Sequence, residues 1–237
     1  MPKLKPWYKV VTPREDLREG KPLDASEFAV HLDQVRQGRA NEDYQNPARF
    51  FERTFLTKNL RQVAGEVVRR LSGENTETSA VFNMATQFGG GKTHALTLLY
   101  HLTSNGLKAE NWPGVSTILR QAGVQHVPQA AIGVFVGTEF DSIQGRGGDD
   151  GTPHRKTPWG EIAFQISGEE GFNVVAEHEK QQIAPGGEVI RKFLPHDRPC
   201  LILVDELMNY ISRNRKSGLG TQIYNFIQNL SEEARGN

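Results

Sequence analysis

Apolar residues follow two different patterns along this chain, and each pattern predicts a different kind of element. Three short runs, residues 80–85, 130–136 and 201–204, are apolar at nearly every position. Runs of strand length without a polar face are typical of parallel strands that helices cover on both sides. The sequence therefore predicts an α/β fold in which a parallel sheet has flanking helices.

Outside these runs, apolar residues recur three and four positions apart, which is the spacing of one helix face. This spacing predicts a helix after Thr57, whose hydroxyl is placed to cap it, and further helices over residues 94–103, 115–121, 159–166, 172–183 and 222–234. Residues 1–46 are polar and divided by prolines, with a short helix expected over residues 28–35. We therefore expect a mainly helical N-terminal region, residues 1–78, and a core, residues 79–237.

A glycine-rich stretch joins the first apolar run to the helix over residues 94–103. It reads Thr86-Gln87-Phe88-Gly89-Gly90-Gly91-Lys92-Thr93. Glycines let successive backbone N–H groups turn toward an anion, and the start of the following helix adds its own N–H groups and dipole. This context predicts a phosphate-binding loop, although Thr86 stands where the usual pattern has glycine.

The loop residues have distinct expected roles. Lys92 would neutralise the β- and γ-phosphates of a nucleotide, and the Thr93 hydroxyl would bind the accompanying Mg²⁺. Nucleotide contacts are predicted for nine consecutive residues: Thr86, Gln87, Phe88, Gly89, Gly90, Gly91, Lys92, Thr93 and His94.

Two carboxylates follow the third apolar run. Asp205 and Glu206 come directly after residues 201–204, which places them at the C-terminal edge of the sheet, where open α/β sheets bind ligands. Asp205 is expected to hold Mg²⁺ together with Thr93, and Glu206 to polarise the attacking water. The predicted catalytic residues are thus Glu206 and Lys92, and the predicted cofactors are ATP and Mg²⁺.

Composition narrows the function classes only slightly. Lys plus Arg and Asp plus Glu both number 28, so net charge gives no argument for nucleic acid or a membrane surface. Apolar runs fall short of the roughly 18 residues that a membrane span needs, and no membrane partner is expected. The single cysteine, Cys200, excludes an internal disulfide and favours a cytoplasmic location. The 7 histidines lack metal-site spacing.

Two charged segments each allow more than one interpretation. The helix after Thr57 has a basic face, expected to be solvated, with nucleic-acid contact as the sharper alternative; its members are Lys58, Arg61, Arg69 and Arg70. Residues 145–156 are rich in glycine and charge and are predicted to form a flexible surface loop. The Asp149-Asp150 pair within them is expected to be solvated rather than to bind a cation.

The order of these elements resembles the P-loop NTPases of the type with an additional catalytic glutamate. In that class two more strands follow the Asp-Glu strand, together with a sensor residue, an arginine finger and a helical lid. The resemblance therefore implies a core that is incomplete and truncated at the C-terminus. It also implies that the charge-stabilising arginine comes from sequence outside this chain or from a neighbouring subunit of a homo-oligomer.

Four segments are similar to one family within that class. They are Phe50-Phe51-Glu52-Arg53-Thr54-Phe55-Leu56-Thr57, residues 86–94, Thr157-Pro158-Trp159-Gly160-Glu161-Ile162-Ala163 and Leu201-Ile202-Leu203-Val204-Asp205-Glu206-Leu207. They resemble the N-terminal part of a family of large prokaryotic AAA-type ATPases, described as a domain of unknown function and often encoded beside DNA methylases in anti-phage loci. The resemblance implies ATP binding, with DNA or a DNA methylase as a partner.

The leading hypothesis is an ATP-binding and ATP-hydrolysing module of a larger anti-phage or DNA-transaction protein. The alternative is a nucleotide-dependent scaffold or switch that binds ATP with little hydrolysis. A third hypothesis is a P-loop kinase that passes phosphate to a small acceptor. Glu206, placed to activate water, argues against that kinase.

Overall fold

The computed structural model describes residues 4–13, 15–20, 30–85 and 91–236, in a chain that divides into two compact units. The first unit, Met1–Val30, contains the 3-10 helix η1 (Trp7–Lys9) and the short helix α1 (Glu15–Arg18). The second unit, His31–Asn237, contains all the other described elements. The helix predicted over residues 28–35 lies partly outside the described residues, and helix α2 (Leu32–Arg36) covers its second half.

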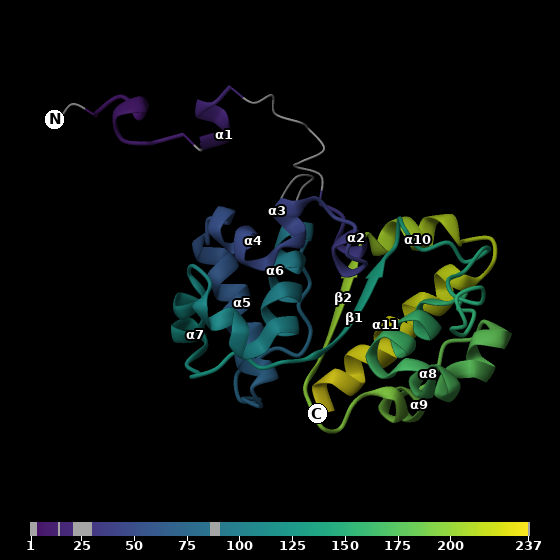
Figure 1. The fold of residues 1–237 in the computed structure, drawn as a ribbon. Coiled ribbons are helices and arrows are strands. Elements are labelled where there is room, and N and C mark those ends of the chain that lie inside the picture. Colours follow the sequence, from purple (N-terminus) through teal and green to yellow (C-terminus); the bar gives the residue numbers. More distant parts are fainter. Residues whose placement is uncertain (1–3, 14, 21–29, 86–90, 237) are drawn as a thin grey trace. The chain divides into compact units, whose positions relative to one another are not determined.

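Helices cover both faces of a small sheet in the second unit (Figure 1). The sheet consists of strands β1 (Ala131–Val136) and β2 (Cys200–Asp205), which run parallel in a register from Ala131 opposite Cys200 to Val136 opposite Asp205. One face is covered by helices α3 (Glu42–Gln45), α4 (Pro47–Arg53), α5 (Lys58–Leu71), α6 (Lys92–Asn105), η3 (Gly106–Asn111) and α7 (Val115–Ala122). The other is covered by α8 (Pro158–Gln181), α9 (Gly187–Phe193), α10 (Leu207–Arg213) and α11 (Leu219–Gly236).

Alternate strand residues enter two separate hydrophobic cores. Val134, Val136 and Leu203 belong to the core formed with helices α4–α7, while Ala131 and Phe135 belong to the core formed with α8–α11. Successive side chains of a strand point to opposite faces, so a strand between two helical layers must be apolar throughout. The parallel pairing and the helices on both faces agree with what the apolar runs predict.

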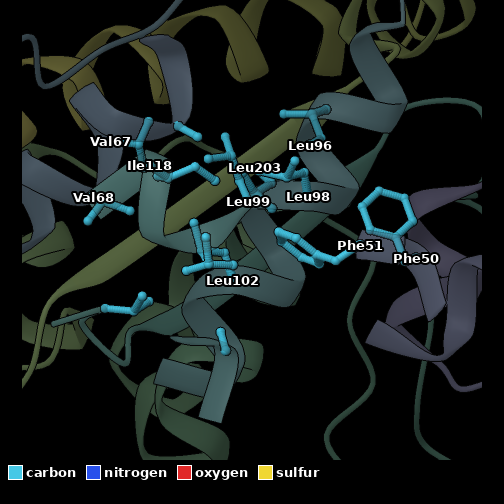
Figure 2. Packing of buried hydrophobic residues seen from close by; sticks show 14 of the residues in the cluster. Phe50, Phe51, Val67, Val68, Leu96, Leu98, Leu99, Leu102, Ile118 and Leu203 are labelled. Atoms are coloured by element: carbon cyan, nitrogen blue, oxygen red, sulfur yellow. The ribbon is translucent and has the colours of Figure 1, made fainter. Parts of the chain in front are cut away.

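The core on the α6 side draws on helices before and after the predicted boundary at residues 78 and 79. Figure 2 shows Leu203 of β2 among side chains of α6, with Val67 and Val68 of α5 nearby and Phe51 of α4 at the other end. The helices of the predicted N-terminal region therefore share one core with the helix that follows the glycine-rich stretch.

Helix starts follow the capping signals in the sequence. The Thr57 side chain accepts a hydrogen bond from the Leu60 N–H at 3.2 Å, as its position predicts. Thr157 accepts from the Gly160 N–H at 3.1 Å and begins α8. The predicted interruption between residues 166 and 172 is a kink in α8, where Gly168 has a φ of 62°.

A side chain covers part of the edge of β1 that does not pair with β2. The Gln165 amide of α8 accepts from the Val134 N–H at 2.7 Å and donates to the Val134 carbonyl at 2.9 Å. A single glutamine thus satisfies both backbone polar groups of a strand residue, in the way that a neighbouring strand would.

The predicted strand over residues 80–85 is wrong. Residues 81–85 have no regular secondary structure, although Phe82 and Met84 pack against the α6-side core and the residues between them are exposed. At Val81 a side chain takes the backbone groups: the Ser79 hydroxyl accepts from the Val81 N–H at 3.2 Å and donates to the Val81 carbonyl at 2.6 Å. Such side-chain bonds compete with a strand ladder for the same backbone groups.

Residues 145–156 form a surface loop whose tip, residues 148–151, is exposed as predicted, but the two arms of the loop are held in place. An antiparallel bridge joins Arg146 to Arg155, and both arginines bind the buried carboxylate of Glu161 on α8, at 3.1 Å and 2.8 Å. Arg146 also pairs with Asp33 of α2 at 2.8 Å. Burial by itself would raise the pKa of Glu161, but the Arg155 hydrogen bond and the Arg146 charge hold it below its usual value.

Removal of the Glu161 carboxylate should strongly destabilise the domain. Glu161 is 1% exposed, so Glu161→Ala leaves the buried Arg155 guanidinium without its carboxylate partner, and we expect a loss of about 3 kcal/mol in the free energy of unfolding at pH 7. Because the folded-state pKa is depressed, the carboxylate's contribution is complete above the ordinary glutamate pKa and is lost as the pH falls through the folded value. Urea denaturation at several pH values measures both effects.

The matched control is Glu188→Ala, which removes an exposed carboxylate that pairs with Lys192 at 2.8 Å. It should leave the urea midpoint unchanged, because exposed pairs contribute little. Equal midpoints for the Glu161 and Glu188 variants would contradict a stabilising role for the buried network.

Candidate functional site

The two predicted motifs meet through one hydrogen bond. The Thr93 hydroxyl, in the first turn of α6, donates to the Asp205 carboxylate, at the end of β2, over 2.7 Å. Asp205 is buried, and its second oxygen accepts from the Glu206 N–H at 3.0 Å. Residues 112 positions apart in the chain thus form one polar centre at the C-terminal edge of the sheet.

Helix α6 begins in a way that suits an anion. Gly91 is its N-cap and has a φ of 73°, a left-handed conformation that glycine adopts without steric cost. The first intrahelical bond runs from the Ala95 N–H to the Gly91 carbonyl, at 3.0 Å, so the preceding N–H groups of Lys92, Thr93 and His94 lie at the positive end of the helix dipole. Five of the nine predicted nucleotide contacts lie outside the described residues and stay predictions: Thr86, Gln87, Phe88, Gly89 and Gly90.

The His94 side chain faces the helical region before the glycine-rich stretch. Its Nε2 atom is 3.1 Å from the Thr54 hydroxyl, and its ring lies 4.7 Å from the Phe50 ring, between centroids. Burial lowers the pKa of His94. His94 therefore offers the helix N-terminus its backbone N–H, while its imidazole is engaged with α4 and the residue after it.

Glu206 occupies a strained backbone position. Its φ of 50° and ψ of 34° are left-handed, which is uncommon for a residue other than glycine, and it is the N-cap of α10. Its side chain is exposed, and its Oε2 atom accepts from the Asn209 amide at 2.9 Å. Strain of this kind, worth roughly 1–3 kcal/mol, tends to collect at functional sites.

The end of β1 closes tightly against the backbone of Glu206. The Gly137 N–H donates to the Asp205 carbonyl at 2.9 Å, and a Cβ on Gly137 would lie 2.1 Å from the Glu206 carbonyl oxygen. Arg213 of α10 reinforces this junction by donating to the Gly137 carbonyl and to the Phe140 carbonyl, the latter at 3.1 Å. The exposed residues Thr138 and Glu139 consequently emerge beside Asp205.

Sequence reasoning missed Gly137, Asn209 and Arg213. Only Gly137 carries a signal in the sequence, because a glycine directly after a buried strand indicates close backbone approach. The roles of Asn209 and Arg213 depend on contacts that no spacing rule predicts.

The donor set fits a hard cation. Mg²⁺ takes oxygen ligands and keeps several waters, so one hydroxyl and one carboxylate, here on Thr93 and Asp205, are typical of its protein ligands beside a phosphate. Over the described part of the chain, no group of three or more His, Cys, Asp and Glu residues is placed to hold a metal ion. Burial raises the pKa of the Cys200 thiol to about 12, so it stays protonated at neutral pH.

Comparison with known proteins places the chain in a family. A family model for the DUF499 N-terminal domain matches residues 8–123 and 148–235. This chain belongs to the DUF499 family. Curated proteins give no match to this DUF499 chain, and solved structures give none. The matched ranges contain Thr93, Asp205 and Glu206, while β1 and Gly137 lie in the unmatched interval.

The described helices give no sign of a membrane segment, since each is too short or too polar to cross a bilayer.

Gly137→Ala should destabilise the domain, because the added Cβ would overlap the Glu206 carbonyl oxygen. Overpacking of this kind costs about 1–3 kcal/mol. Gly186→Ala is the control, since nothing lies within 4 Å of its added Cβ. Thermal denaturation of both variants measures the difference, and equal melting temperatures would show that the β1–α10 junction yields without cost.

Proposed function

We propose that this DUF499 domain has a P-loop NTPase core, binds ATP with Mg²⁺ and hydrolyses it. The observation that carries the proposal is the 2.7 Å hydrogen bond from Thr93 to Asp205. It joins the helix that follows a Gly-Gly-Gly-Lys-Thr sequence to the end of a buried strand that carries Asp-Glu. A structural turn alone would not require these two segments to meet through the residue types that bind Mg²⁺ and phosphate.

Each residue of the site has a task in that chemistry. Lys92 and the N–H groups at the start of α6 neutralise and orient the phosphates. Thr93 and Asp205 would hold Mg²⁺, which would supply positive charge to the phosphate groups. Glu206 accepts a hydrogen bond from a water and takes its proton as the water oxygen bonds to the γ-phosphorus. The bond from that phosphorus to the bridging oxygen breaks, and ADP and phosphate are the products.

The resemblance of four sequence segments to large prokaryotic AAA-type ATPases supports a wider setting. In that setting the domain works within an anti-phage or DNA-transaction protein, with DNA or a DNA methylase as partner. An arginine from outside this chain, or from a second copy in a homo-oligomer, would then stabilise the transition-state charge.

One observation favours the alternative, a nucleotide-dependent scaffold or switch. The Asn209 amide engages one of the two carboxylate oxygens of Glu206, and this bond restrains the group that must reach water. Direct comparison of MgATP binding with phosphate release separates the two functions. Tight binding with phosphate release no faster than the buffer blank supports the switch, whereas steady release supports the ATPase.

Glu206→Gln should leave MgATP affinity unchanged and lower phosphate release at least a hundredfold, because the amide cannot take the proton from water. Calorimetry measures the affinity, and a coupled phosphate assay measures turnover. Glu188→Gln on α9 is a matched exposed control and should change neither quantity. Turnover unchanged by Glu206→Gln would rule out Glu206 as the general base.

A further inference from the structure

We infer that Phe55 is the base-stacking surface of the nucleotide site and that the site therefore prefers purine over pyrimidine nucleoside triphosphates. This inference rests on the proposed ATP binding and adds to it the residue that holds the base. The sequence of the phosphate loop specifies only how phosphates are bound, so the base must be recognised elsewhere.

Phe55 lies in the short connection between α4 and α5, and this connection touches the first turn of α6. The preceding residue, Thr54, has its hydroxyl 3.1 Å from the Nε2 atom of His94. His94 directly follows Thr93, which bonds to Asp205. The contact between Thr54 and His94 thus places the connection that carries Phe55 against the first turn of α6, which also contains Lys92 and Thr93.

The Phe55 ring is exposed, unlike the other aromatic rings of its segment. Its residue is 85% exposed, whereas Phe50 is 2% and Phe51 is 1% exposed. A single exposed phenylalanine needs no explanation by itself. Its position makes the difference, because the connection that carries Phe55 contacts the first turn of α6, where the proposed phosphates would bind.

The connection that carries Phe55 is anchored on both sides. The Thr54 hydroxyl donates to the Phe50 carbonyl at 2.7 Å, and Leu56 packs inward as part of the α6-side core. Thr57 caps α5 through the Leu60 N–H and donates its own N–H to the Phe55 carbonyl at 2.9 Å. The backbone at Phe55 is therefore held in place by its neighbours, so that little backbone freedom is lost when a base binds.

Stacking determines the class of ligand. Every base has a π-face, so an aromatic ring selects by stacking area rather than by hydrogen bonding. The larger purines gain more from such contact than pyrimidines. The ring by itself does not separate adenine from guanine, so the inference concerns the purine class.

The test compares two ligands on the whole 237-residue chain. With Mg²⁺ present, Phe55→Ala should weaken ATP binding about tenfold and leave binding of inorganic tripolyphosphate unchanged, because tripolyphosphate has no base to stack. The ratio of ATP to CTP affinity should also fall toward one. Tyr224→Ala, which removes an exposed aromatic ring on α11, is the matched control and should change none of these values.

A second variant tests the stacking contact directly by fluorescence. Phe55→Trp should keep ATP affinity, and its added fluorescence should be quenched by ATP but not by tripolyphosphate. Wild-type binding of both ligands with no effect of Phe55→Ala on ATP would overturn the inference and leave ATP binding standing. Failure of the wild type to bind either ligand would overturn the proposed function, and this inference with it.

Discussion

A hydrogen bond of 2.7 Å between a hydroxyl and a carboxylate joins the two segments that carry the proposed functional residues of this domain. The contact between Thr93 and Asp205 requires α6 to begin at the carboxyl end of β2, which in turn requires an apolar face of α6 to pack along the sheet. Leu98, Leu99 and Leu203 supply that packing in one continuous core. Packing in this core fixes the position of α6 relative to β2. The hydrogen bond from Thr93 to Asp205 then joins the N-terminus of the helix to the acidic end of the strand.

Much of the fold follows from burial alone, and burial is what an apolar pattern reports. Both described strands agree with their apolar runs, and the Thr57 cap forms as expected. The segment over residues 80–85 shows the limit: Phe82 and Met84 are partly buried in alternation, but the Ser79 hydroxyl binds the Val81 N–H and carbonyl, which a ladder would need. The apolar pattern predicts which side chains are buried. It does not predict whether a backbone N–H or carbonyl bonds to another strand or to a nearby side chain.

The candidate site likewise has one part that the sequence predicts and another part that it does not. Strand ends of a parallel sheet share one edge, so the meeting of Thr93 with Asp205 was predictable from sequence order. A glycine directly after a buried strand indicates close backbone approach at Gly137, but that its neighbour is the Glu206 carbonyl depends on the packing of two chain segments. The left-handed backbone of Glu206 was equally hidden, since only the junction between a buried strand and α10 imposes it.

The glutamine that covers β1 has a consequence for how the sheet is extended. Gln165 occupies both backbone groups of Val134, so an incoming strand would first have to displace a half-buried side-chain amide. Pairing of another strand at Val134 would therefore cost the two hydrogen bonds that this amide makes. At this residue the edge of β1 is thus protected against association with a second chain by a side chain of the same domain.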